Sequence, residues 1–232
     1  ESDFTSYTEY LKLLDQLLDN GELVYSNLSN KLKNNYDVTI TAVTKAGLGL
    51  NHVPDRLKNN EDVVMAAVRQ NGCQLMFVSN ELANNFDIVL AAVTQNGYAL
   101  EDASMKVRNN FDIVLAAVKR YGYALEFASE ELRNDHRIVL AAVKQDGYAL
   151  DFASMKLQND RDIVLAAVQQ DGYVLKFASE ELLKDRGIVH AAVQKDGHAL
   201  EFAVVKLQND RDVVMAAVKQ NGYALKFASR EL

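Results

Sequence analysis

The 232-residue chain has one cysteine, one proline and no tryptophan. Because Cys73 stands alone, no internal disulfide can form, which indicates a reducing compartment such as the cytosol. No apolar run approaches the roughly 20 residues of a membrane span, so we expect no membrane-spanning helix. Residues 1–10 are polar and acidic and have no signal-peptide core. The chain also lacks a starting Met, and we expect it to be a fragment of a longer protein.

Positive charge is scarce as well. The chain has 25 Lys and Arg against 32 Asp and Glu, a net charge of −7. A surface that binds phosphates needs a positive field, so this balance argues against nucleic acid as a partner. The sequence also has no Gly-rich phosphate loop, HExxH, CxxC or serine elbow. We therefore expect no catalytic residue, no metal and no cofactor in this chain.

Repetition is what the sequence has in abundance. Glycines recur every 25 residues, at Gly47, Gly72, Gly97, Gly122, Gly147, Gly172, Gly197 and Gly222. Self-similarity at such a period is typical of stacked repeats, in which each repeat buries its apolar face against its neighbours. We predict an N-terminal capping helix with a degenerate repeat over residues 1–36. Tandem repeats should then form a single elongated domain over residues 37–232.

The first half of each repeat is predicted to be an α-helix. In one repeat Asp112 precedes six apolar residues, 113–118, and Gly122 follows the polar end of the segment. Asp is a common N-cap residue, and Gly after a helix commonly adopts the left-handed conformation. Six consecutive apolar positions cover nearly the whole circumference of a helix. We therefore expect this helix to be buried on several sides.

The second half of each repeat is shorter. Residues 123–128 should form one or two helical turns, and Ser129 should cap a further turn over residues 129–132. Twenty-five residues leave no room for two full helices with their loops. The predicted fold is all-α: an α-solenoid with one α-helix plus a short helix or 3₁₀ turn per repeat, and no strands.

The repeat signature AAVxxxGxxLxxA, with LxND before the next helix, is specific. It resembles the tandem repeats catalogued as domain of unknown function 4116, from about Gly21 onward. Those repeats occur in bacterial effector proteins delivered into host cells and also in some protist and viral proteins. The resemblance implies a helical array, and for an effector it implies action in a host cell after secretion. It implies no catalytic residue. The spacing is also similar to the leucine-rich repeat variant, which serves as an analogy of shape.

Three columns of side chains follow the 25-residue period. A Tyr follows most of the glycines, and the column could be a contact surface. We favour instead that each ring packs over the Gly turn of the neighbouring repeat. A Phe column that includes Phe152 and Phe177 is predicted to be core. An Asn column that includes Asn134 is predicted to be buried and to satisfy backbone groups at the corner before the next helix.

One repeat departs from the pattern and supplies the candidate partner-binding residues. Apolar side chains replace mostly polar ones there, two lysines flank them, and two histidines replace Leu or Met and Tyr. An exposed apolar patch with a basic rim often marks a partner site, whereas drift in one copy of a repeat is the alternative. The two histidines could share a metal ion, but we favour separate, partly buried roles. The candidates are Leu183, Lys184, His190, His198, Val204, Val205 and Lys206.

We interpret the chain as a non-catalytic, monomeric scaffold for protein–protein interaction, because long regular surfaces are what such arrays offer. The alternative is a substrate-recruiting arm of a larger enzyme whose catalytic domain lies outside this chain. A third hypothesis is an array that reads one nucleic-acid base per repeat, which the acidic balance disfavours.

Overall fold

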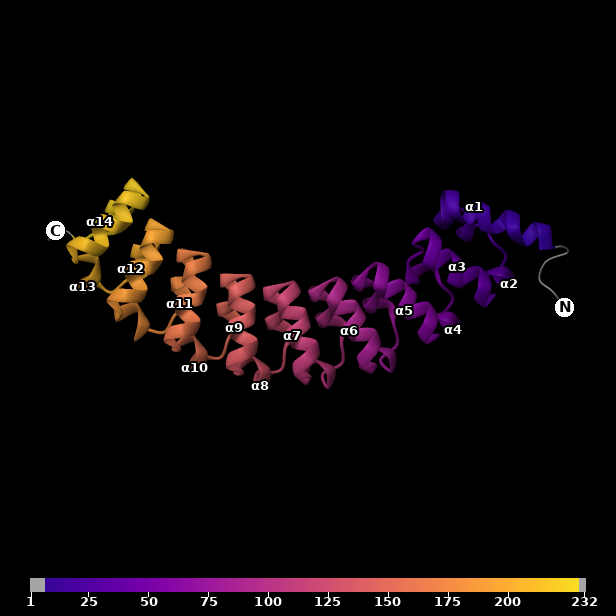
Figure 1. Ribbon diagram of the computed structural model, residues 1–232, viewed down its shortest axis with the longest axis horizontal. Coiled ribbons are helices and arrows are strands. Elements are labelled where there is room, and N and C mark those ends of the chain that lie inside the picture. Colours follow the sequence, from indigo (N-terminus) through magenta and orange to yellow (C-terminus); the bar gives the residue numbers. More distant parts are fainter. Residues whose placement is uncertain (1–6, 230–232) are drawn as a thin grey trace. The chain divides into compact units, whose positions relative to one another are not determined.

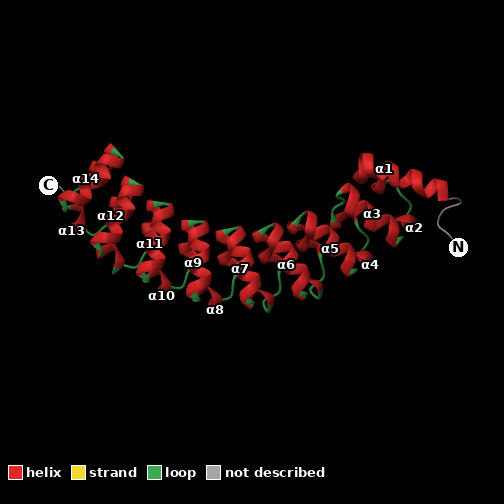
Figure 2. Ribbon diagram, viewed as in Figure 1, coloured by secondary structure: helices red, strands yellow, loops and turns green. Residues whose placement is uncertain are grey.

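The computed structural model describes residues 7–229, and every regular element in that range is a helix (Figure 2). The predicted all-α class is therefore confirmed. The predicted cap, residues 1–36, contains α1 (Tyr7–Ser26) and α2 (Asn30–Lys33), and its residues 1–6 lie outside the described range. The long helices that follow are α3 (Tyr36–Ala46), α5 (Glu61–Gln70), α6 (Phe86–Gln95), α7 (Phe111–Arg120), α9 (His136–Gln145), α11 (Arg161–Gln170), α12 (Arg186–Lys195) and α14 (Arg211–Gln220).

Short helices connect the long ones. A 3₁₀ segment follows each long helix: η1 (Leu50–His52), η2 (Gly72–Phe77), η4 (Gly97–Asp102), η6 (Gly122–Phe127), η7 (Gly147–Phe152), η8 (Gly172–Phe177), η10 (Gly197–Phe202) and η11 (Gly222–Phe227). A single turn then leads to the next long helix. It is α-helical in α4 (Asp55–Lys58), α8 (Glu130–Arg133), α10 (Met155–Gln158) and α13 (Val205–Gln208), and 3₁₀ in η3 (Leu82–Asn84), η5 (Val107–Asn109) and η9 (Leu182–Lys184).

The chain divides into two compact units, residues 1–108 and residues 109–232. In the N-terminal unit, α1 packs on α3, α3 on α5 and α5 on α6. In the C-terminal unit, α7, α9, α11, α12 and α14 pack side by side in chain order, as Figure 1 shows. The segments η6, η7, η8, η10 and η11 pack on one another as a second layer. None of the described helices is long and apolar enough to cross a membrane.

The long helices begin two residues earlier than predicted. The N-cap of α7 is Asn110, whose Oδ1 accepts hydrogen bonds from the backbone N–H groups of Asp112 and Ile113, at 3.0 and 3.1 Å. Asp112, the predicted cap, is instead the second residue of the helix, where its charge suits the helix dipole. The same capping position is occupied by Asn60, Asn85, Asp135, Asp160, Asp185 and Asp210.

The helix ends also differ from the prediction. Only Gly47 has a positive φ, 69°, among the described residues. α9 ends at the extended Asp146, φ −149°, and Gly147 begins the 3₁₀ segment. Close approach requires glycine at several of these later positions, because a Cβ on Gly147 would stand 2.7 Å from the carbonyl oxygen of Ala167 in the next repeat, whereas Gly222 has no such neighbour among the described residues. The left-handed conformation predicted for the whole glycine column is therefore wrong beyond Gly47.

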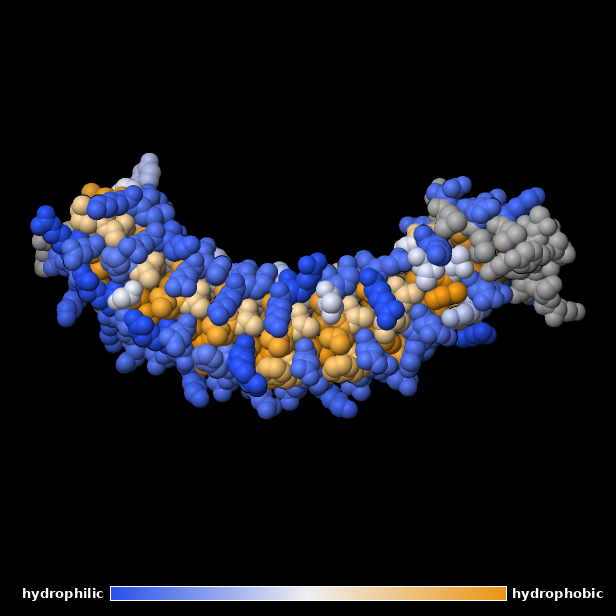
Figure 3. Space-filling view, viewed as in Figure 1, coloured by the Kyte–Doolittle hydropathy of each residue, from blue (hydrophilic) through white to orange (hydrophobic). Residues whose placement is uncertain are grey.

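Burial of the long helices is one-sided. In α7 the side chains of Ile113, Val114, Ala117 and Val118 are fully buried, whereas Leu115 is only half-buried. The buried residues follow the helical period and form one face. The predicted burial on several sides therefore extends over one face only, and apolar surface (orange in Figure 3) stays accessible.

Contacts between repeats differ from what is predicted for the Phe column and for the Asn column. Tyr148 packs edge-to-face on Phe177 of the next repeat, with ring centroids 6.1 Å apart. Phe177 is half-buried and belongs to this aromatic ladder, not to the core. Asn134 is exposed, and its Oδ1 accepts a hydrogen bond from the Ser154 hydroxyl of the next repeat at 2.7 Å. The Asn column therefore links repeats through side chains, and the prediction of a buried backbone-satisfying ladder is wrong.

Candidate functional site

Leu183 and Val204, two of the predicted partner-binding residues, lie beside one another. The backbone N–H of Val204, just before α13, points at the carbonyl oxygen of Leu183 in η9, at 3.5 Å. In the preceding repeats the equivalent bond is shorter, as in the 3.0 Å bond from Ser179 to Gln158. Leu183 and Val204, two apolar residues of adjacent repeats, are therefore neighbours, and the backbone contact between them is longer than its equivalents.

A side-chain link between repeats is missing at the same point. Elsewhere a Ser hydroxyl donates to an Asn of the preceding repeat, as Ser154 does to Asn134 at 2.7 Å. Here Val204 stands at the Ser position and Lys184 at the Asn position, so both partners are replaced. Val204 is also an N-cap without a side-chain hydrogen bond, whereas Ser154 accepts one from the Leu157 N–H at 3.3 Å.

Leu183 replaces another hydrogen-bonding residue. The equivalent Gln158 and Gln208 are half-buried, and each donates from Nε2 to two carbonyl oxygens at the end of its own 3₁₀ segment, at 3.1 and 3.3 Å. Leu183 has no donor for those carbonyls. These equivalent glutamines therefore bind the backbone of their own repeat instead of simply facing solvent. With Leu183 in this position, the repeat lacks those hydrogen bonds and has apolar surface instead.

Exposure completes the description of this surface. Val205 is 71% exposed, Leu183 and Val204 are half-buried, and Lys184 and Lys206 are exposed on either side in the chain. We call these five residues the α13 patch. It combines an apolar centre with two cationic neighbours.

The two candidate histidines lie in different surroundings, and neither set of neighbours includes a residue of the α13 patch. His190, on α12, lines a groove with Asp212, Met215 and Lys219 of α14. His198, in η10, contacts Asp196 through Nδ1 at 3.1 Å and packs edge-to-face on Phe227, with ring centroids 6.1 Å apart. Within the described residues, no three His, Cys, Asp or Glu side chains are grouped so that they could hold a metal ion.

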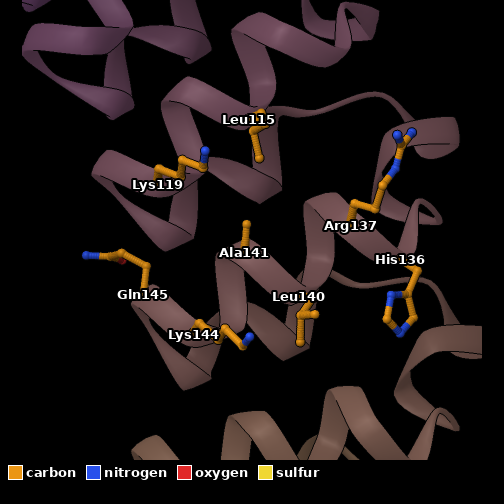
Figure 4. Close-up of a pocket in the computed structure, with 8 residues that line it drawn as sticks. All are labelled: Leu115, Lys119, His136, Arg137, Leu140, Ala141, Lys144 and Gln145. Atoms are coloured by element: carbon orange, nitrogen blue, oxygen red, sulfur yellow. The ribbon is translucent and has the colours of Figure 1, made fainter.

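Grooves between successive long helices are a feature that the sequence interpretation missed. The groove between α7 and α9 has a volume of about 550 Å³. We call it the α7–α9 groove, and Figure 4 shows the residues that line it: Leu115, Lys119, His136, Arg137, Leu140, Ala141, Lys144 and Gln145. The half-exposed Leu column on the long helices was the available signal. His190 stands in this column, which shows that the position tolerates a polar side chain.

Ion pairs between repeats lie at the N-terminal ends of the long helices. Arg186 donates to Asp210 at 2.8 Å and to Asp212 at 2.8 Å. The hydrogen bond from Arg186 is the main reason why the pKa of Asp210 is lowered to about 2, with the backbone N–H of Val213 contributing. The pKa of Asp185 is also lowered, first by the backbone N–H of Ile188 and then by Arg161. These carboxylates are helix caps that also link repeats.

Side-by-side helices, a second layer of 3₁₀ segments and glycine contacts that recur every 25 residues define a tandem helical-repeat protein. The chain belongs to the family described as Domain of unknown function (DUF4116), whose model matches residues 40–83, 60–108, 85–133, 110–158, 135–183 and 185–232. The predicted resemblance is thereby confirmed. The chain matches no curated protein and no solved structure.

Proposed function

We propose that this chain is a non-catalytic scaffold that binds another protein, and that the α13 patch contributes to the binding surface. One observation carries the proposal. Three neighbouring positions that form polar links in other repeats have lost those links: Leu183 and Val204 present apolar surface instead, and Lys184 presents a cation.

This exchange costs stability. A missing N-cap side chain costs about 0.5–2 kcal/mol, and each missing hydrogen bond about 0.5–1.5 kcal/mol. Selection tolerates a loss of stability where it brings a gain in function. Positions at which a chain departs from the pattern of its own repeat are therefore expected to be functional. The concentration of three such losses around Val204 therefore supports a functional surface over random drift.

The chemistry of the α13 patch suits a protein partner. An apolar centre with a charged rim is the usual anatomy of an interface. Val205 supplies the most exposed apolar side chain, and Lys184 and Lys206 would attract acidic groups of the partner. The carboxylates with lowered pKa, such as Asp210, are committed to helix caps and ion pairs, which supports a structural role for them.

The cellular setting belongs to the same proposal. The single Cys73 supports a reducing compartment, and we propose that the monomeric chain works in the cytosol. Action in a host cell after secretion rests on the family resemblance alone.

Affinity capture from a cytosolic extract tests the proposal. The bait is the whole chain, compared with the triple variant Leu183→Gln, Val204→Ser, Val205→Glu, which carries residues that equivalent positions already have. We expect at least one captured protein whose recovery falls at least tenfold with the triple variant. The matched control is Met155→Glu, since Met155 is the equivalent of Val205 and is 86% exposed. If every captured protein binds the triple variant as well as the unaltered chain, the α13 patch is not a partner site.

A further inference from the structure

We propose a second binding site, separate from the α13 patch: the α7–α9 groove binds a segment of a partner protein in which an acidic residue adjoins a large apolar one. This proposal does not depend on the α13 patch. It follows from the apolar floor of the groove, from the charge of its rim and from the way in which Arg137 is held.

The floor of the groove is apolar and accessible. Leu115 of α7 and Leu140 of α9 are half-buried, and Ala141 lies between the helices. Figure 4 shows Leu115 and Ala141 facing one another across the groove. The volume, about 550 Å³, falls within the roughly 300–1,000 Å³ of typical ligand sites. The groove is therefore large enough to receive an apolar side chain of a partner.

The rim of the groove is cationic at both ends. Arg137 lies at one end, beside His136, which lies 3.9 Å from Asp160 of the next repeat, and Lys119 and Lys144 lie toward the other end (Figure 4). None of the described residues that line this groove is a carboxylate. The grooves between α5 and α6 and between α12 and α14 each contain one, Asp87 and Asp212, at the position equivalent to Arg137. Arg137 therefore reverses the charge at this one position, and the α7–α9 groove keeps its cations without the carboxylate that accompanies Arg69 or Lys219 in the other two grooves.

Arg137 stands where a cation is disfavoured. It is the second residue of α9, and positive charge at a helix N-terminus opposes the helix dipole. Its guanidinium lies 4.2 Å from the centre of the Phe111 ring, and its Nη2 donates to Asp135 at 3.1 Å. This bond is the main reason why the pKa of Asp135 is lowered. The two contacts hold in place a side chain that the helix alone would not favour.

Enough positive charge is left for a ligand. Asp135 offsets part of the charge of Arg137, but Oδ1 of Asp135 also caps α9. The Arg137 side chain remains 71% exposed, and a guanidinium has five N–H donors. Lys119 and Lys144 are exposed and form no ion pair within the described part of the chain. An arginine held in this way is suited to a carboxylate, because little side-chain freedom is lost on binding.

The occupant must use both features of the groove. Inorganic phosphate or a nucleic-acid backbone would contact the cations but would leave Leu115 and Leu140 exposed. A peptide segment with Glu or Asp beside Leu, Met or Phe covers the apolar floor and pairs with the rim. This charge and shape complementarity commits the proposal to a protein segment.

Selection from a random dodecapeptide display library on the whole chain tests the proposal. We expect enriched peptides to pair acidic residues with a large apolar one, and a synthetic peptide from the pool to bind at least tenfold more weakly to Arg137→Asp. That variant should fold, because Asp87 and Asp212 stand at the same position in other repeats. Leu140→His should weaken binding likewise, and His190 shows that the position accepts histidine.

The matched control is Lys156→Glu, which changes the net charge equally at an exposed position where neighbouring repeats carry Glu131 and Glu181. It should leave peptide affinity unchanged. The proposal is overturned if no peptide is enriched, if enriched peptides lack acidic residues, or if Arg137→Asp has no greater effect than the control. The triple variant of the α13 patch should bind the peptide normally, so failure of one proposed site can be told from failure of the other.

Discussion

A Cβ on Gly147 would stand 2.7 Å from the carbonyl oxygen of Ala167, which belongs to the next repeat. Because this carbonyl oxygen belongs to the backbone, Gly147→Ala should force two repeats apart and reduce the free energy of unfolding by roughly 1–3 kcal/mol. Chemical denaturation measures this loss. Gly222→Ala is the control, since no described atom lies within 4 Å of a Cβ at Gly222. Equal effects of the two substitutions would show that close approach is not the reason for the glycine.

Gln145 should stabilise the contact between two repeats. Its Oε1 accepts a hydrogen bond from the buried backbone N–H of Gly122. Gln145→Ala would leave that donor without its partner, at a cost of about 1–3 kcal/mol. Gln170→Ala is the matched control, because Gln170 forms no such bond in the described part of the chain. Thermal denaturation of both variants measures the difference, and indistinguishable midpoints would contradict the assigned role.

Restoring the polar links of the α13 patch should stabilise the chain. Val204→Ser supplies the missing N-cap, worth about 0.5–2 kcal/mol. Adding Lys184→Asn restores here the equivalent of the hydrogen bond between Ser154 and Asn134, worth about a further 0.5–1.5 kcal/mol. A double-mutant cycle by chemical denaturation isolates the coupling between the two substitutions. Zero coupling would mean that the Ser–Asn contact contributes nothing to the link between repeats.

Acid should weaken the ion pair between Arg186 and Asp210. The pKa of Asp210 is about 2 in the folded chain, below the ordinary value of about 3.9. A lowered pKa adds stability that is complete above pH ~4 and is lost as the pH falls toward ~2. Arg186→Gln should therefore raise the pKa of Asp210 and shift acid unfolding to higher pH.

Carboxyl carbon NMR titration measures the pKa of Asp210 directly. Arg161→Gln is the control, because Arg161 pairs with Asp185 and should leave Asp210 unchanged. A pKa for Asp210 that stays near 2 in Arg186→Gln would assign the shift to the backbone N–H of Val213 instead.

Part of the candidate site could be predicted from the sequence. Leu183 and Val204 were recognisable because sister repeats carry other residues at those positions, and the structure places the two side by side. His190 and His198 departed from the pattern equally clearly, yet their neighbours differ from one another and include no residue of the α13 patch. A departure from a repeat shows that a residue differs, but the surface that it joins depends on the direction of its side chain.

The sequence alone determined the period of 25 residues, the helical class and the family, because glycine spacing and apolar runs are local signals. Only the tertiary structure decided which side of each helix stays open, why the later glycines are needed and how Arg137 is held. These features depend on atoms roughly one repeat away, such as the carbonyl of Ala167 above Gly147 and the ring of Phe111 beneath Arg137. Neighbours across a repeat contact are set by packing, which no local pattern encodes.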